Sequence, residues 1–222
     1  MFRRRRRERE RAAPVAEEAS VPQRESGPWD ADEPHPEGER VDLGGMLLPI
    51  GPGFEVQLNV AGDQIVGAVI LVDGSALQVH AFAAPKRSGI WDEVRGELKR
   101  EVTASGGTAE EVEGPFGVEL AARVRQGEAL QPVRFCGIDG PRWFLRAVIS
   151  GKAAVDAEAA ATLEDVVRDI VVVRGDHPMP PKEPIELRLP PEARQAMEQQ
   201  AAQTGRPDLN PFERGPEITE TR

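Results

Sequence analysis

The chain has 222 residues, of which 39% are hydrophobic, and this length can hold one domain of roughly 100 to 150 residues together with tails. Its 38 acidic and 28 basic residues give a net charge of -10, which excludes general attraction to nucleic acid or anionic lipid except through local basic patches. The single cysteine, Cys136, excludes an internal disulfide and a cysteine-based zinc site, and it suits a reducing cytoplasm. We expect it to be a small buried side chain rather than a reactive thiol.

An arginine cluster near the start of the sequence could hold the phosphates of nucleic acid or of an anionic membrane by charge alone. It comprises Arg3, Arg4, Arg5, Arg6 and Arg7. Because acidic residues at 17, 18 and 30–39 compete for these charges, we expect a solvated, disordered tail instead. No apolar run of the ~7 to 15 residues of a secretory signal follows, and none approaches the ~20 of a membrane span. We therefore expect a cytoplasmic protein without a transmembrane segment.

Residues 12–39 are rich in Pro, Glu, Ala and Ser, with too little apolar surface to offset the entropy of ordering, so we interpret them as a linker. Trp29 is the exception, because a lone aromatic in such a segment commonly docks on the adjacent domain or on a partner. Docking on its own domain is the more economical expectation. The predicted organisation is a disordered basic-then-acidic tail at 1–40, one domain at 41–177, and a Pro-rich, largely disordered tail at 178–222.

Alternating and apolar runs predict four antiparallel strands in the first half of the domain. They cover 44–49, a short edge strand, then 54–60, 64–72 and 76–83. Gly62-Asp63 and Asp73-Gly74 supply the hairpin turns. The run at 64–72 is nearly all apolar, which favours a central strand covered on both faces.

The period then changes to about 3.6 residues over 90–102, which predicts an amphipathic helix with Trp91 on its apolar stripe and Ser88 as its cap. Four more strands are expected at 108–113, 116–124, 133–138 and 142–149, the last two joined by an Asp-Gly-Pro turn. A second helix begins at a capping Asp156 and presents Leu163 and Val167 inward. Residues 171–173 could form a last strand, but we favour a helix that runs into an extended tail.

The predicted fold class is α+β: a mainly antiparallel sheet of about seven or eight strands covered by two helices. The order of elements looks like the Mog1 and PsbP type of α/β/α sandwich. This analogy of pattern confers no function.

Five short blocks in a fixed order suggest a family. They read RVDLGG (40–45), FAAP (82–85) with SGIW (88–91), EGPFG (113–117), IDGPRW (138–143) and VVVRGD (171–176). Together they resemble the actinobacterial proteins catalogued as domain of unknown function 3710, over roughly residues 27 to 190. The resemblance implies an intracellular actinobacterial protein with no established activity and no catalytic residues to carry over.

If neighbouring strands are antiparallel, several loops gather at one edge of the sheet and form a candidate binding rim. Its residues are Lys86, Arg87, Ser88, Glu113, Asp139, Arg142, Arg174, Asp176 and His177. This rim could bind an anion or dock a protein. The alternative is that these are turn residues making local hydrogen bonds and salt bridges.

No catalytic, cofactor or metal site is predicted. Glu113 and Asp139 could act as an acid/base pair, but nothing in the sequence would raise either pKa. The three histidines, His35, His80 and His177, lack metal-ligand spacing. Three hypotheses follow: a non-enzymatic binding or adaptor domain with a protein partner, which we favour; attachment of the arginine cluster to nucleic acid or membrane; and an enzyme with a cleft between sheet and helix.

Overall fold

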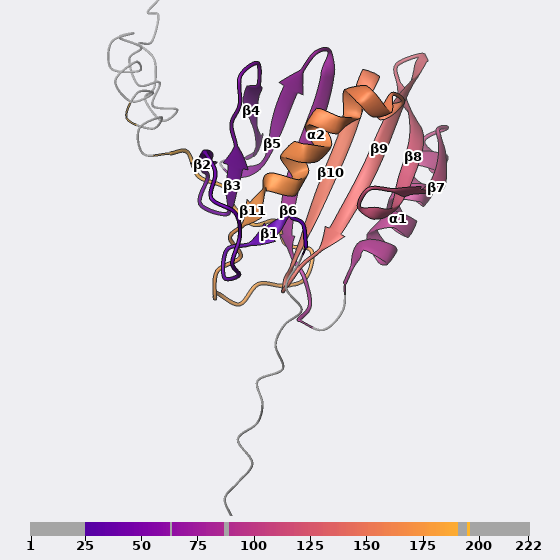
Figure 1. Cartoon of the computed structure of the whole chain (residues 1–222). Helices are drawn as coiled ribbons and strands as arrows, with labels where there is room; N and C mark the ends of the chain where they lie inside the picture. Colours follow the sequence, from indigo (N-terminus) through magenta and orange to yellow (C-terminus); the bar gives the residue numbers. More distant parts are fainter. Residues whose placement is uncertain (1–24, 63, 87–88, 191–194, 196–222) are drawn as a thin grey trace, which may run out of the picture.

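The computed structural model describes residues 25–62, 64–86, 89–190 and 195. A seven-stranded antiparallel sheet dominates it (Figure 1). In spatial order its strands are β4 (Glu55–Ala61), β5 (Gln64–Val72), β6 (Ser75–Ala83), β10 (Trp143–Gly151), β9 (Ala129–Asp139), β8 (Gly117–Gln126) and β7 (Thr108–Gly114). With the two helices described below, this sheet confirms the predicted α+β class.

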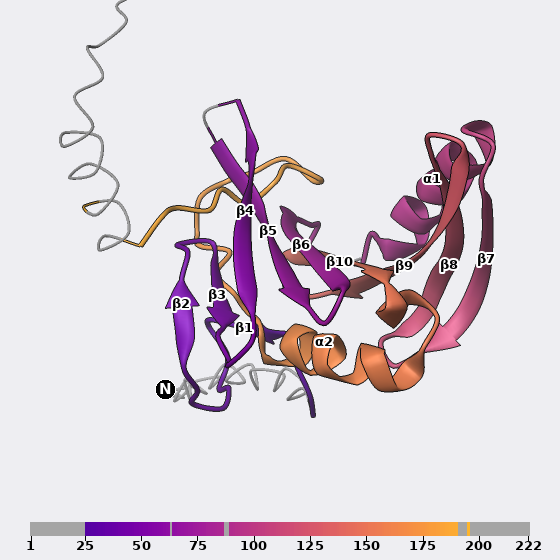
Figure 2. The same cartoon turned by 90° about the horizontal axis from the view of Figure 1, so that it is seen from above.

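The two helices cover opposite faces of the sheet (Figure 2). Helix α1 (Trp91–Ala104) lies over β7, β8 and β9, with Trp91 and Val102 buried. Helix α2 (Ala157–Asp169) lies on the other face and follows a short 3₁₀ turn at Lys152–Ala154. Its predicted cap is present, since the Asp156 carboxylate accepts from the backbone N–H of Glu158 and Ala159. We call the two sides of the sheet the α1 face and the α2 face.

A second, four-stranded sheet was not predicted. Its order is β1 (Trp29–Asp30), β11 (Val171–Val172), β3 (Met46–Pro49) and β2 (Arg40–Asp42). The strand at Met46–Pro49 therefore does not extend the large sheet as expected. The preference for a helix running into a tail at 171–173 was also wrong, because the β-branched Val171 and Val172 are fully buried and pair with Leu47 and Met46.

Two segments assigned to a linker and a tail pack on the domain. Trp29–Asp30, from the expected linker, pairs in parallel with Val171–Val172. After Pro178 the chain is extended as expected, but residues 182–187 bond to the end of β6 and to the start of β5. Leu187 donates its backbone N–H to Ile65 at 2.8 Å, and Ile185 donates to Ala81 at 2.9 Å. We call this C-terminal segment the C-terminal strap. Strands β5 and β6 pair with each other only over 68–79, and the strap bonds to both strands beyond the paired region.

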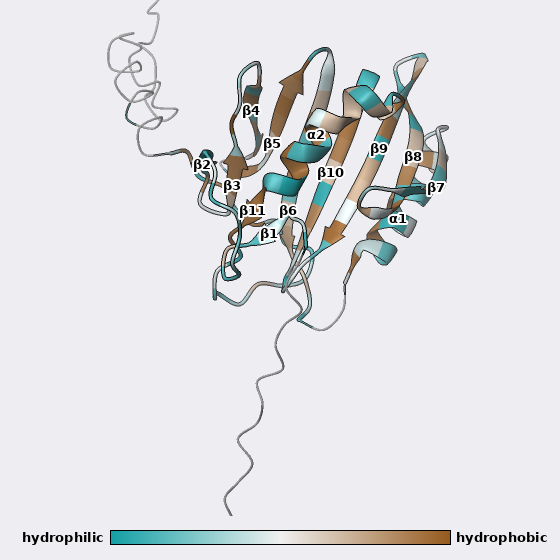
Figure 3. Cartoon of the chain, viewed as in Figure 1, coloured by the Kyte–Doolittle hydropathy of each residue, from teal (hydrophilic) through white to brown (hydrophobic). Residues whose placement is uncertain are grey.

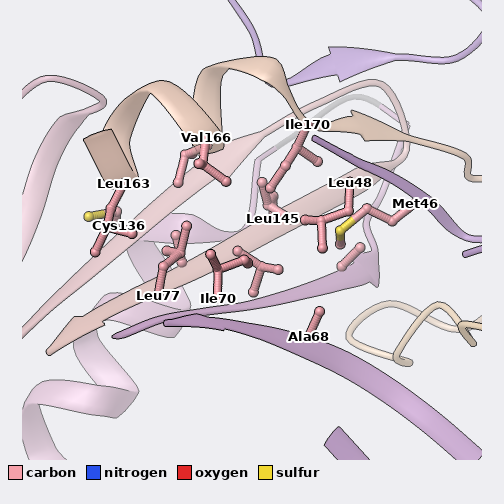
Figure 4. Packing of buried hydrophobic residues seen from close by; sticks show 14 of the residues in the cluster. Met46, Leu48, Ala68, Ile70, Leu77, Cys136, Leu145, Leu163, Val166 and Ile170 are labelled. Carbon is pink, nitrogen blue, oxygen red and sulfur yellow. The ribbon is translucent and has the colours of Figure 1, made fainter. Parts of the chain in front are cut away.

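The main core lies between the α2 face of the sheet, α2 and the small sheet. Leu163, Val166 and Ile170 from the α2 segment point at Leu77 and Leu145 in the sheet (Figure 4). The hydropathy colouring of Figure 3 follows this arrangement, with brown concentrated on β3, β5 and β10 and teal on the outer side of α2. The strand at 64–72 is less covered than predicted, because only Gly67, Ala68 and Ile70 are buried and its other residues are partly or fully exposed. No helix in the described residues is long and apolar enough to cross a membrane.

Candidate functional site

The strand register gathers several predicted rim segments at one edge of the large sheet. Ala83, at the end of β6, pairs with Trp143, and Asp139, at the end of β9, pairs with Phe144. The loop after β6 and the turn between β9 and β10 are therefore neighbours. Arg174 approaches them from the far end of β11, donating its Nε–H to the backbone oxygen of Arg142 at 3.3 Å.

Five of the predicted rim residues line one concavity of about 530 Å³, which we call the rim cleft. They are Lys86, Arg142, Arg174, Asp176 and His177. The other lining residues are Ala84, Pro85, Pro178, Met179, Pro180 and Pro181. Prolines fix much of this wall, because their ring restricts the backbone dihedral φ.

The cations of the rim cleft outnumber its carboxylates by three to one. Arg174 is held by backbone oxygens, donating also to His177 at 3.0 Å. Arg142 lies 3.6 Å from Asp176, whose side chain is fully exposed, so water screens this ion pair strongly. Lys86 is exposed and has no hydrogen-bond or ion-pair partner among the described residues. The cleft is thus a positive concavity on a protein whose net charge is -10.

The remaining predicted site residues lie elsewhere. Asp139 accepts the backbone N–H of Ile90 at 2.8 Å and of Trp91 at 3.3 Å, so its carboxylate holds the start of α1. Glu113 is the penultimate residue of β7. This strand is three strands away from β10, so Glu113 lies about 14 Å along the edge from it. Trp29 is half-buried in β1, on its own domain. Arg3, Arg4, Arg5, Arg6, Arg7, Arg87 and Ser88 lie outside the described residues.

A second concavity, of about 130 Å³, lies between α1 and the α1 face of the sheet. We call it the aromatic pocket. It is lined by Phe82, Ile90, Val94, Glu97, Phe144, Arg146 and Lys182. Phe82 from β6 and Phe144 from β10 stack with ring centroids 6.1 Å apart, and the rings of His80 and Trp91 extend this row at its two ends.

The sequence reasoning missed this pocket. The sequence does carry a signal for it. His80 and Phe82 are two residues apart, as are Phe144 and Arg146, so each pair lies on one face of its strand. The pocket stands where the enzyme hypothesis placed a cleft, between sheet and helix. Its one carboxylate, from Glu97, accepts a hydrogen bond from Lys182 at 2.8 Å, so the lining has no convergent pair of carboxylates for acid/base chemistry.

Two polar groups beside the aromatic pocket are buried without partners. Arg146 stands directly opposite His80 across β10 and β6, and both the Nε of Arg146 and the Nδ1 of His80 lack a hydrogen bond in the structure. Burial and, secondarily, the Arg146 charge lower the pKa of His80 from 6.5 to about 4. Burial also lowers the pKa of Arg146, which the charge of Glu101 on α1 partly offsets.

A buried ionic cluster lies on the α2 face. Arg134 donates to Glu119 at 2.9 Å and to Glu164 of α2 at 2.9 Å, and Glu119 is only 1% exposed. Burial opposes the charge of Arg134, but its bonds to Glu119 raise the pKa of the guanidinium. Burial and the Glu119 charge raise the pKa of the adjacent Cys136 thiol well above its usual range. This cluster is a packed ion-pair network in which Arg134 bridges Glu119 and Glu164, while the second oxygen of Glu119, Oε1, is buried without a hydrogen bond from the described residues.

Among the described residues, no group of three or more His, Cys, Asp or Glu side chains could hold a metal ion. Two concavities combine a shape with a distinctive charge: the rim cleft, which is cationic, and the aromatic pocket, which is largely apolar and has the Arg146 guanidinium in its lining.

Comparisons with known proteins agree with the sequence resemblance. The model of the family described as "Protein of unknown function (DUF3710)" matches residues 27–196. No curated protein matches the chain. Among solved structures, the chain is similar to the solution structure of cyanobacterial PsbP (CyanoP) from Synechocystis sp. PCC 6803. That similarity has 14% identity and a TM-score of 0.42, and it covers 60% of this chain and 91% of the other.

Proposed function

The chain belongs to the family of proteins of unknown function DUF3710, and we propose that its domain is a non-enzymatic binding module that docks an acidic segment of a partner protein in the rim cleft. The observation that carries this proposal is the charge of the cleft: Lys86, Arg142 and Arg174 face one exposed carboxylate, that of Asp176. A concentrated positive field on an acidic protein selects acidic partners and orients their approach.

The construction of the cleft also supports docking. Arg174 bonds to three backbone oxygens, of Arg142, Gly175 and His177, so its guanidinium is fixed in place before any partner arrives. Such preorganisation reduces the entropy that binding must offset. The exposed prolines 178, 180 and 181 add a wall with little conformational freedom.

The test uses the full chain and a fluorescein-labelled decaglutamate peptide as the probe, with decaglutamine as its neutral counterpart. The variant Lys86→Glu with Arg142→Asn changes the charge of the cleft by -3, and asparagine tolerates the positive φ of 61° at position 142. The control Arg125→Glu with Arg123→Asn makes the same charge change at exposed positions near the far end of β8. Fluorescence anisotropy measures binding at low and physiological salt.

We expect decaglutamate to bind, decaglutamine not to bind, and the cleft variant to lose at least tenfold in affinity while the control loses less than twofold. Affinity should also fall as salt rises, because the interaction is electrostatic. Equal losses in the two variants would show a general charge effect and overturn the proposal, as would the absence of binding to decaglutamate.

A further inference from the structure

The aromatic pocket has the dimensions of a site for one small ring. Its volume of about 130 Å³ is close to that of a cavity of ~150 Å³ that accepts benzene in another protein. Phe82 and Val94, which are partly exposed, line it together with the buried Phe144 and Ile90. An apolar ring placed there would be in contact with aromatic and aliphatic groups on several sides.

The polar edge of the pocket defines the charge of its occupant. The guanidinium of Arg146 lies over the Phe82 ring, 5.2 Å from its centroid, and makes no hydrogen bond or ion pair with any described residue. The charge of Glu101 on α1 acts on this guanidinium without forming an ion pair with it, and its Nε–H is buried without an acceptor. A half-buried guanidinium in this state is unusual, because its charge is partly desolvated and its donors are unused. The nearest carboxylate in the lining, Glu97, is already bonded to Lys182.

The C-terminal strap closes one side of the pocket. Lys182 is anchored to the sheet by its backbone N–H, which donates to Ala83 at 2.8 Å, and to α1 by its ammonium, which donates to Glu93 at 2.9 Å and Glu97 at 2.8 Å. The two carboxylates balance the charge of Lys182, so Arg146 is the one cation of the lining that forms no ion pair with a described residue.

We propose that the aromatic pocket binds a small monocarboxylate carrying a single six-membered ring. The ring packs against the partly exposed side chains of Phe82 and Val94, and the carboxylate accepts hydrogen bonds from the Arg146 guanidinium. One unpaired guanidinium matches one negative charge, and the fork of its N–H groups matches the two oxygens of a carboxylate. The small volume, about 130 Å³, favours a ligand with a single ring. This site is separate from the rim cleft and does not depend on its function.

The test follows the ¹⁵N–¹H spectrum of the full chain during titration with benzoate, and repeats it with benzamide and acetate. Benzamide keeps the ring without the charge, and acetate keeps the charge without the ring. We expect saturable shifts at the backbone amides of Phe82, Phe144 and Arg146 with a Kd of about 1 mM or below. Benzamide and acetate should each bind at least tenfold more weakly.

Two pocket variants and one matched control distinguish a specific site from general association. Arg146→Gln should weaken benzoate binding at least tenfold, because it removes the charge-assisted hydrogen bonds. The matched control Arg100→Gln removes an exposed arginine of α1 and should leave the affinity unchanged. Val94→Phe fills the pocket from α1 and should abolish the shifts, which gives a second test should Arg146→Gln not fold.

The absence of amide shifts at benzoate concentrations up to 20 times the expected Kd of ~1 mM would overturn the proposal. Equal affinities for benzoate and benzamide, or unchanged benzoate binding by a folded Arg146→Gln variant, would also overturn it. Shifts confined to Lys86, Arg142 and Arg174 would assign benzoate to the rim cleft and would also overturn it. The Lys86→Glu, Arg142→Asn variant is expected to bind benzoate normally, so the two proposals fail independently.

Discussion

The indole Nε1 of Trp143 donates a hydrogen bond of 2.6 Å to the Asp30 carboxylate, which comes from a segment 113 residues earlier. Both residues are buried, Asp30 at 4% exposure and Trp143 at 0%. The other oxygen of Asp30 accepts the backbone N–H of Asp32 at 2.8 Å. One carboxylate therefore fixes the two-residue strand β1 and joins the small sheet to the large one.

Replacement of Asp30 by Ala should lower the free energy of unfolding by about 2 to 3 kcal/mol, because it leaves the buried indole N–H without its acceptor. Asp30→Asn should cost less, since it keeps one acceptor oxygen. Urea denaturation followed by near-ultraviolet circular dichroism measures both. Glu37→Ala removes the same charge at an exposed position and should change stability by less than about 0.5 kcal/mol. An Asp30→Ala protein as stable as this control would contradict the structural role.

Helix α1 rests on the sheet through the contact of Trp91 with Gly137. A Cβ added at Gly137 would overlap the Trp91 indole ring, whose Nε1 donates to the backbone oxygen of Val118 at 2.6 Å. We expect Gly137→Ala to displace this ring and to destabilise the protein by about 1 to 3 kcal/mol. Faster amide exchange in α1 would report the displacement. Gly38→Ala, where the added Cβ meets only ordinary contacts, should have little effect, and equal behaviour of the two variants would refute the close-packing argument.

Local signals in the sequence were sufficient for the large sheet and both helices. The Asp73-Gly74 turn, for example, has positive φ at both residues, 45° and 72°, as the hairpin prediction requires. Hairpin order then followed from short connections, so the shared edge that carries Arg142 and Lys86 could also be predicted.

Contacts distant in sequence could not be predicted in the same way. A strand of two residues such as Trp29–Asp30 has no periodicity to detect, and its partner Val171–Val172 lies at the other end of the domain. The aromatic pocket depends on the register between β6 and β10, which sets Arg146 opposite His80 across 66 residues of chain. Register between strands so far apart in the chain is set by packing, which single-sequence patterns do not contain.

The C-terminal strap should contribute to the stability of the whole domain through Ile185 and Leu187, which are 5% and 2% exposed. Leu187→Ala is expected to lower the free energy of unfolding by about 2 to 4 kcal/mol, because it leaves a cavity in the main core. Glu186→Ala, at the exposed position between them, is the control and should be nearly neutral. Equilibrium urea denaturation compares the two. Equal stability would mean that the strap is not part of the cooperative unit.

Cys136 should behave as an inert core side chain. It is fully buried, and its raised pKa keeps the thiol protonated at neutral pH. We expect iodoacetamide to label it only as fast as the protein unfolds, with full labelling in 6 M guanidinium chloride. Rapid labelling of the native protein at pH 7 would instead identify an accessible, reactive thiol.

The pH dependence of stability should carry a contribution from His80. Its folded pKa of about 4 lies below the unfolded value of 6.5, so between these pH values a proton binds the unfolded chain and not the native one. The stabilising effect of His80 is therefore complete above pH 6.5 and decreases as the pH falls toward 4. The full difference corresponds to about 3 kcal/mol.

The comparison of wild type with His80→Gln isolates this contribution, because the carboxylates titrate equally in both proteins. The free energy of unfolding of the wild type should fall more steeply between pH 6.5 and 4 than that of the variant. Arg146, directly opposite on β10, also favours the neutral ring, so Arg146→Gln should move the histidine pKa upward in an NMR titration. Parallel stability curves for wild type and His80→Gln would show that the imidazole titrates alike in the folded and unfolded chain, which its burial at 8% exposure argues against.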